Sequence, residues 1–273
     1  MISIIIAWKN RDELYRSIDS FINVVNVLKG EVILVNYCGQ LDYERLPKHD
    51  DLRIVEITGR DFFNKASANN IGSSYAKNNN LFFCDCDIVL ELDAVQRCLE
   101  LLVLPKSFVT IKHVQEEKIN AIDINHIQCF GYHMIIKTRD GQQVEIVDFE
   151  EDAATGIRNA PGLLFLTQDH MQKINGYSGF MQGWGWEDQD MICRLTLGLG
   201  LSRQQHGTLL HLSHDDHSRT KEYPEVSSRW ESRDRMFRSA LSRYDQNIFL
   251  GTLQEDLLSH STREVTRSTL CTA

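Results

Sequence analysis

Two acidic residues follow a short apolar run in the segment Asp85-Cys86-Asp87. The apolar residues 81–84 before them are typical of a buried strand, which places both carboxylates at its carboxyl end. In open α/β sheets this end faces the ligand crevice. Because alternate residues of an extended chain point the same way, both acids could approach one diphosphate–metal site. A solvated strand end would give the same pattern.

A second cluster is the segment 183–190, which reads Gly-Trp-Gly-Trp-Glu-Asp-Gln-Asp. Two tryptophans between glycines favour a turn that is covered by a flat apolar ligand face, and sugar rings present such faces. Three acids follow within four residues, and their mutual repulsion can raise a pKa and suit one acid to act as a base. Acids also complement a helix dipole, so the same residues are expected to begin a helix.

A third cluster, residues 211–217, contains three histidines in seven residues. Imidazole and carboxylate groups together suit manganese or zinc. The apolar residues 208–210 predict a strand that delivers His211 and His214 to a common site. The choice between these two histidines and His217 as ligands stays open at this level.

The elements that would position these clusters alternate between strands and helices. Apolar, β-branched runs predict strands over 2–8, 31–35, 53–57 and 81–84, and helical spacing predicts helices over 11–29, 64–77 and 92–103. The second half predicts a hairpin over 132–148, a strand over 163–166, a helix from Thr167 to Gly176, and a turn followed by a helix over 181–200. This pattern indicates an α/β fold with a mostly parallel central sheet flanked by helices.

Composition restricts the class of protein. The 273 residues are 42% hydrophobic and 25% charged, with 29 basic and 38 acidic residues and a net charge of −9. These values exclude disordered and fibrous classes and argue against a nucleic-acid binder, which needs a basic face. Seven cysteines lack any Cys-x-x-Cys pair, which argues against a disulfide framework and for a reducing compartment. The first residues predict a buried strand rather than a signal peptide, and we expect a cytoplasmic protein.

The three clusters, in this order, resemble the GT-A glycosyltransferases, specifically the β-1,4-galactosyltransferase group and its bacterial relatives. The resemblance covers residues 2 to about 217. Asp85-Cys86-Asp87 is similar to the family's Asp-x-Asp, and Trp184-Gly185-Trp186-Glu187-Asp188 is similar to its signature Trp-Gly-x-Glu-Asp. The turn Ala7-Trp8-Lys9-Asn10-Arg11 resembles the nucleotide-binding turn, and Phe63-Asn64-Lys65-Ala66 resembles the helix beside the uracil and diphosphate.

The resemblance implies a role for each matched residue. Asp188 would be the catalytic base, Glu187 would hold the acceptor sugar as a second catalytic residue, and both would bind the acceptor together with Trp184 and Trp186. Asp87, His211 and His214 would bind Mn²⁺ or another divalent cation, with His211 standing where vertebrate members have a methionine. The implied donor-binding residues are Ala7, Trp8, Asn10, Arg11, Phe63, Lys65, Asp85 and Asp87. Ala7 and Lys9 depart from the family's pattern, and Lys65 replaces an arginine without its bidentate geometry.

The implied function is metal-dependent, inverting transfer of a hexose or N-acetylhexosamine from a UDP-sugar to a hydroxyl of a glycan or glycolipid. The alternatives are a nucleotidyltransferase and a non-catalytic nucleotide-sugar binding module. We expect one domain, 1–273, with a nucleotide-sugar-binding half (1–107), an acceptor and catalytic half (108–217) and a C-terminal helical tail (218–273). The arginine-rich stretch 229–243 could contact the inner face of a membrane, but interleaved Glu231 and Asp234 favour a salt-bridged surface helix.

Overall fold

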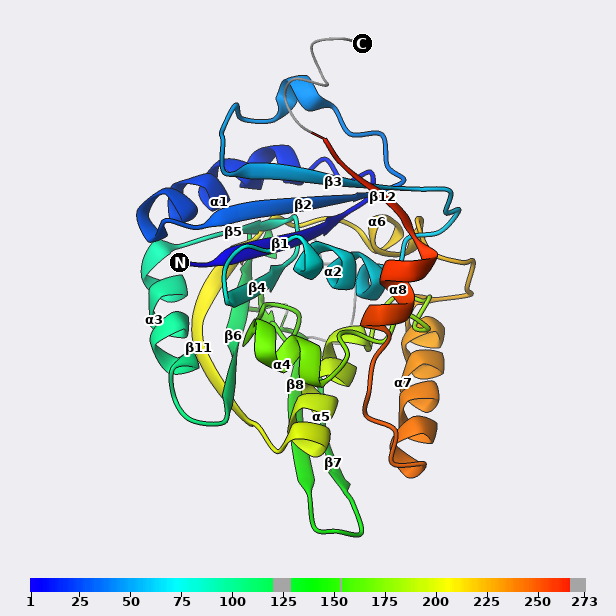
Figure 1. Ribbon diagram of the computed structural model, residues 1–273. Helices are drawn as coiled ribbons and strands as arrows, with labels where there is room; N and C mark the ends of the chain where they lie inside the picture. The colour runs from blue at the N-terminus through cyan, green and yellow to red at the C-terminus, as the bar shows by residue number, and fades with distance from the viewer. Residues whose placement is uncertain (120–128, 153, 266–273) are drawn as a thin grey trace.

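The computed structural model describes residues 1–119, 129–152 and 154–265 (Figure 1). A ten-stranded sheet crosses the molecule in the order β12-β3-β2-β1-β4-β10-β6-β11-β5, with β9 paired to β6. Its strands are β1 (Ser3–Trp8), β2 (Glu31–Tyr37), β3 (Leu52–Thr58), β4 (Asn80–Cys84), β5 (Ile88–Val89), β6 (Ser107–Glu116), β9 (Ile157–Asn159), β10 (Leu164–Thr167), β11 (Ser202–His211) and β12 (Ser261–Val265).

The N-terminal half of the sheet is parallel and covered on both faces. The strands β1, β2, β3 and β4 pair in parallel, and every residue of β1 and β2 is buried. Helix α1 (Leu14–Leu28) packs with Ile4 and Ile6 on one face, whereas α2 (Lys65–Ser74) packs with Ile5 on the other. Continuous apolar strands are stable only with both faces covered, which explains the sequence pattern.

The second half adds antiparallel strands and a separate hairpin. Strand β10 pairs antiparallel with β4 and β6, and the long β11 runs parallel to β6. The hairpin of β7 (Cys129–Lys137) and β8 (Gln143–Asp152) forms its own two-stranded sheet and extends beyond the body of the molecule (Figure 1). More residues are paired in parallel than antiparallel in the central sheet, so the predicted α/β class is confirmed.

The remaining helices flank this sheet. They are the 3₁₀ helix Tyr43–Arg45, α3 (Leu92–Leu102), α4 (Gln168–Lys173), α5 (Glu187–Leu199), α6 (Asp216–Thr220), α7 (Arg229–Asp245) and α8 (Leu253–Ser259). In the described part of the chain, no helix is long and apolar enough to cross a membrane.

The C-terminal segment differs from the predicted helical tail. Its described part contains three helices, but it ends in β12, which pairs antiparallel with β3 at the sheet edge. The side chains explain this pairing, because Arg53 Nε lies 2.7 Å from Glu264 Oε1 and Arg263 Nε lies 2.6 Å from Glu56 Oε2. An unpaired edge of β3 is thereby covered. Residues 266–273, including Cys271, lie outside the described residues, and the other six cysteines are free thiols.

Candidate active site

A cavity of about 210 Å³ opens where β1, β4 and β11 end. Its lining includes Ala7 at the end of β1, the segment 85–87 after β4, and His211 at the end of β11. The carboxyl ends of neighbouring parallel strands meet at one edge of a sheet, which brings these distant segments together. All three predicted clusters contribute residues to this one cavity.

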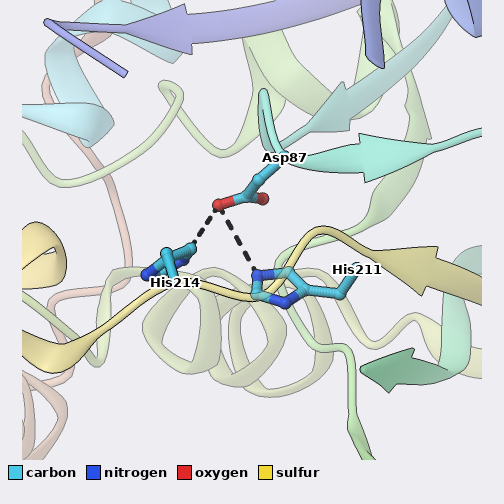
Figure 2. A group of neighbouring side chains, drawn as sticks. All are labelled: Asp87, His211 and His214. Carbon is cyan, nitrogen blue, oxygen red and sulfur yellow. Dashed lines mark ion pairs between the residues drawn. The ribbon is translucent and has the colours of Figure 1, made fainter. Parts of the chain in front are cut away.

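One wall of the cavity carries a group of three potential metal ligands, Asp87, His211 and His214 (Figure 2). Oδ2 of Asp87 lies 3.2 Å from Nε2 of His214 and 3.5 Å from Nε2 of His211. One ligand atom from each residue lies within 4.8 Å of the others. One carboxylate and two imidazoles suit Mn²⁺ or Zn²⁺, so the residues fit a divalent cation. His217 lies outside this group, exposed on α6.

Glu116 supports this group and was not identified from the sequence. Its Oε2 lies 2.8 Å from Nδ1 of His211, which directs the opposite nitrogen toward Asp87. Glu116 also accepts hydrogen bonds from Ser213 Oγ at 2.7 Å and from Arg158 Nε at 2.9 Å. Glu116 and His211 are neighbours because β6 and β11 pair in register. A carboxylate behind a ligating histidine fixes the orientation of its ring.

The electrostatics of this group favour charged carboxylates. Burial would raise the pKa of Asp87, but His211, His214 and Arg11 hold it well below its usual range. Burial also opposes ionisation of Glu116, yet hydrogen bonding and charge from His211 lower its pKa. For His211 the burial would lower the pKa, whereas Asp87 and Glu116 raise it above its usual value. Both carboxylates are therefore charged and able to bind or support a cation.

A second wall of the cavity is formed by the turn that begins α5. Trp186 has a left-handed backbone, with φ of 72°, and the next two residues, Glu187 and Asp188, open the helix. Nζ of Lys65 lies 3.0 Å from Oδ2 of Asp188 and 3.6 Å from Oε1 of Glu187. Oδ1 of Asp188 and Oε2 of Glu187 are buried and have no hydrogen-bond partner among the described residues.

These two acids have raised pKa values. Burial, with a contribution from Asp188, raises the pKa of Glu187 to about 7. Burial also raises the pKa of Asp188, and the charge of Lys65 opposes this rise. A carboxylate with a raised pKa and an unpartnered oxygen is suited to accept a proton.

Asp85 and Asp87 lie near different partners, although their alternation suggested one shared site. Oδ1 of Asp85 lies 2.8 Å from Nζ of Lys65, on the Asp188 side, whereas Asp87 joins the histidines. The pair therefore links the two walls of the cavity. Six of the predicted donor residues line it: Ala7, Arg11, Phe63, Lys65, Asp85 and Asp87.

Trp8 and Asn10, the other two predicted donor residues, do not line the described cavity. Trp8 is 2% exposed and packs in the core, and its Nε1 donates to the carbonyl oxygen of Arg11. Asn10 donates to Glu222 Oε1 at 3.2 Å and accepts from the backbone N–H of Gln40. Both residues brace the turn that presents Arg11, because their polar atoms are used within the protein.

The two tryptophans of the acidic turn have different environments. Trp184 is partly exposed and lines the cavity. Trp186 also borders the cavity but is only 6% exposed, and its ring packs edge-on against Phe237 at 4.6 Å. Trp184 therefore offers more of its ring to a ligand than Trp186, most of whose surface belongs to the core.

The hairpin supplies cavity residues that the sequence patterns did not indicate. Oδ2 of Asp148 accepts from Gln189 Nε2 at 2.9 Å and from the Tyr132 hydroxyl at 3.2 Å, and all three line the cavity. Burial raises the pKa of Asp148. The hairpin thus packs against the helix that carries Asp188. The sequence predicted a hairpin over 132–148 but not the partner on which it packs.

Two crystal structures of Drosophila β1,4-galactosyltransferase 7 are similar to this chain at low identity. The catalytic domain in complex with xylobiose has 16% identity and a TM-score of 0.46, and the match covers 84% of this chain and 77% of that one. A variant in complex with manganese, UDP-Gal and xylobiose has 15% identity and the same TM-score, with coverage of 85% and 79%.

A family model described as the N-terminal domain of galactosyltransferase matches residues 154–215. The matched segment contains Asp188 and the two histidines of the metal-ligand group, His211 and His214. The part of the chain that supplies the acidic turn and the two histidines of the candidate site is therefore similar to a galactosyltransferase domain, in agreement with the motifs in its sequence.

Proposed function

We propose that this protein is a metal-dependent, inverting glycosyltransferase that uses a UDP-sugar. One observation carries the proposal: the buried acids Glu187 and Asp188 and the group Asp87, His211 and His214 line the same cavity. Unpartnered acid oxygens suit the hydroxyl donors of a sugar, and the histidine–carboxylate group suits a cation beside a diphosphate. The match of residues 154–215 to a galactosyltransferase domain supports the same reading.

Asp188 is the proposed general base. Its unpartnered Oδ1 accepts the proton of an acceptor hydroxyl while that oxygen attacks the anomeric carbon of the donor. The new carbon–oxygen bond forms on the face opposite the leaving group, and the bond to the diphosphate breaks with its electron pair on UDP. The anomeric configuration is inverted. Glu187 accepts a hydrogen bond from a second hydroxyl of the acceptor sugar. Trp184 covers the apolar face of the acceptor.

Asp87, His211 and His214 are the proposed ligands of Mn²⁺ or a similar divalent cation. When bound, the cation offsets the charge that develops on the leaving diphosphate. Arg11, whose Nη2 lies 3.0 Å from Asp87 Oδ2, adds positive charge on the same side. Lys65 holds Asp188 and Asp85 in place from the donor side.

The proposed roles largely follow the order of the segments along the chain. We assign donor binding to residues 1–107 together with the metal ligands His211 and His214, acceptor binding and catalysis to 108–217, and a supporting role to 218–273. Galactose or an N-acetylhexosamine is the proposed sugar, and a glycan or glycolipid the proposed acceptor. Free thiols throughout the described chain support a reducing compartment, and we propose a cytoplasmic location.

The test measures UDP release from a panel of UDP-sugars, with Mn²⁺ or with EDTA, for the wild type and Asp188→Asn. Asparagine keeps the size of the side chain but cannot accept the proton as a carboxylate does. We expect Mn²⁺-dependent release from one donor, reduced at least about 100-fold in the variant, with UDP affinity retained. Asp190→Asn is not a suitable control, because Asp190 forms a buried ion pair with Arg194. Asp169→Asn, on the surface of α4, is the matched control.

Two results would contradict the proposal. Full turnover by Asp188→Asn would remove this residue from the role of base. Mn²⁺-dependent UDP binding without turnover, even with a broad panel of sugar acceptors, would favour the non-catalytic binding module.

A further inference from the structure

Tyr223 lines the cavity from the loop after α6, a segment that lies outside the sequence motifs and the matched domain. It is buried, with 9% exposed, and its ring packs edge-on against Phe63 at 5.4 Å. The carbonyl oxygen of Glu222 accepts a hydrogen bond from the backbone N–H of Phe63 at 2.8 Å, and its Oε1 accepts one from Nδ2 of Asn10 at 3.2 Å. These contacts fix the Tyr223 ring on the side of the cavity that carries the proposed donor residues.

The hydroxyl group of Tyr223 has no hydrogen-bond partner among the described residues. It is also not enclosed, whereas the unpartnered hydroxyl group of Tyr177 is sealed in the interior. A tyrosine that buries its ring usually places its hydroxyl group against a hydrogen-bond partner. Because the Tyr223 ring lines the cavity, the space open to a partner of its hydroxyl group is the cavity itself.

Charged residues on two sides of the cavity lie within electrostatic reach of this hydroxyl group. Burial raises the pKa of Tyr223 well above its usual value, and Glu187 adds to this rise. Asp85 and Asp188 act in the same direction, whereas Lys65 opposes them. The phenol is therefore protonated at neutral pH and able to donate a hydrogen bond. It does so between the acids of the α5 turn and the donor-side ion pair of Lys65 with Asp85.

The proposed reaction brings the transferred sugar into this same region. Asp188 activates the hydroxyl group that attacks the anomeric carbon from the face opposite the diphosphate, so the sugar lies between Asp188 and the metal-ligand group. Ionised carboxylates only accept hydrogen bonds. A sugar hydroxyl that donates to one of them therefore needs a separate donor for its own oxygen, and the Tyr223 phenol is such a donor.

We infer that Tyr223 donates a hydrogen bond to a hydroxyl oxygen of the transferred sugar and thereby helps to select the donor substrate. The inference rests on the proposed function. The diphosphate has other partners, Arg11 and the metal-ligand group, so the Tyr223 hydroxyl group acts on the sugar and not on UDP. A site that hydrogen-bonds a substrate hydroxyl discriminates strongly against an analogue that lacks it.

The test uses Tyr223→Phe, which removes the hydroxyl group and keeps the ring that packs on Phe63. UDP affinity is measured by calorimetric titration with Mn²⁺. The kcat/KM for UDP release is measured with UDP-galactose, UDP-glucose, UDP-N-acetylgalactosamine and UDP-N-acetylglucosamine. We expect an unchanged affinity for UDP and a loss of at least about tenfold in kcat/KM for the preferred donor. Monodeoxy analogues of that donor then identify the contact, because the analogue that lacks the contacted hydroxyl should react equally with the wild type and the variant.

Tyr177→Phe is the matched control. Its hydroxyl group lies within electrostatic reach of the same four charged residues, but Tyr177 does not line the described cavity. This variant should keep the wild-type kcat/KM, and an equal loss in both variants would assign the effect to electrostatics and overturn the inference.

Three further results would overturn the inference. They are an unchanged kcat/KM in Tyr223→Phe, a loss that persists with every deoxy analogue, and a weaker affinity of Tyr223→Phe for UDP itself. If the wild type releases UDP from a sugar nucleotide and Tyr223→Phe does so equally well, the contact alone is refuted. If the wild type does not bind UDP with Mn²⁺, the proposed function is refuted.

Discussion

Lys65 holds three carboxylates together at the centre of the cavity. Its Nζ lies 2.8 Å from Asp85, 3.0 Å from Asp188 and 3.6 Å from Glu187. Burial alone would lower the pKa of this lysine, but the surrounding acids raise it well above its usual value, so the side chain stays charged. The sequence presents Lys65 as a donor-binding cation, and the contacts add a second task, which is to keep the proposed base ionised.

Replacing Lys65 by methionine tests this second task. Burial raises the pKa of Asp188, with a contribution from Asp85, and without the opposing charge of Lys65 this pKa rises further. Because the base acts in its deprotonated form, activity is lost as pH falls through this pKa. The acid limb of the kcat/KM profile should therefore move to higher pH in Lys65→Met, with a loss of about tenfold or more at neutral pH. Lys65→Arg keeps the positive charge, so the acid limb of its kcat/KM profile should lie close to that of the wild type. An acid limb that does not move in Lys65→Met would refute the role of Lys65 in keeping Asp188 ionised.

Glu116 provides a test on the metal side that does not depend on turnover. Glu116→Gln keeps the side-chain size but removes the charge that orients His211 through Nδ1. Loss of such a supporting carboxylate is expected to weaken Mn²⁺ binding about 10- to 100-fold, as measured by calorimetric titration. The neighbouring Glu117→Gln removes an ion pair with Arg16 rather than a contact with the metal-ligand group, and should leave the affinity unchanged. Equal Mn²⁺ affinity in Glu116→Gln would show that the carboxylate does not support the site.

At the scale of elements, periodicity predicted most helices and strands but not their distant partners. The hairpin, the strand before Asp85 and the helix after Trp186 were all expected. The pairing of β6 with β11 was not, and it alone makes Glu116 a neighbour of His211. The buried position of Trp186 depends likewise on Phe237, in α7. Local spacing encodes local structure, whereas these contacts join residues about 50 to 95 positions apart.

The end of helix α1 also depends on a contact that local spacing does not reveal. The first helix was predicted over 11–29, but it ends at Leu28, and Lys29 takes the left-handed position after it, with φ of 55°. The following residue, Gly30, is needed for another reason, because a Cβ atom there would meet the backbone of Ile2, just before β1. The glycine marks a close approach between two elements rather than a backbone conformation of its own.

The loop between β9 and β10 gives a prediction for an element outside the sequence motifs. A Cβ atom on Gly162 would overlap Oδ2 of Asp188 and lie 3.2 Å from Nζ of Lys65. Gly162→Ala should therefore displace the base and lower kcat about 100-fold, since small errors of position have large kinetic effects. The melting temperature should change little, because the new methyl group enters a cavity rather than the core. Gly141→Ala, at the open tip of the hairpin, is the control for kcat alone, because its φ of 90° strains any side chain there. An unchanged kcat in Gly162→Ala would contradict the close packing of this loop.

At the scale of the whole molecule, the C-terminal segment braces the donor side of the site. Asp256 of α8 is buried and accepts hydrogen bonds from Ser67 Oγ at 2.9 Å and Asn70 Nδ2 at 2.6 Å. Both partners belong to α2, whose first residue is Lys65. Strand β12 continues from this helix into the central sheet. The last described elements therefore fix the position of a helix from the first quarter of the chain.

The two walls of the cavity also couple the stability of the whole protein to pH and metal. His211 has a raised pKa in the folded state, so its contribution to stability is fully present below about pH 6.5 and is lost as pH rises through the folded value. The raised pKa of Glu187, about 7, acts in the same direction, because its buried carboxyl group is neutral only at lower pH. Asp87 and Glu116 have lowered pKa values, so both are ionised at about pH 6 and at about pH 8, and their contribution to stability is the same at both pH values.

The metal-free protein should therefore melt at a lower temperature at about pH 8 than at about pH 6, as measured by calorimetry in EDTA. Mn²⁺ binds deprotonated imidazole, so its addition should raise the melting temperature more at the higher pH and reduce the difference. His211→Gln should abolish most of the response to Mn²⁺, whereas His217→Gln, exposed on α6, should keep it. A melting temperature that rises between these pH values without metal would contradict the linkage. An equal Mn²⁺ response in His211→Gln would remove His211 from the metal-ligand group, because binding must then occur elsewhere.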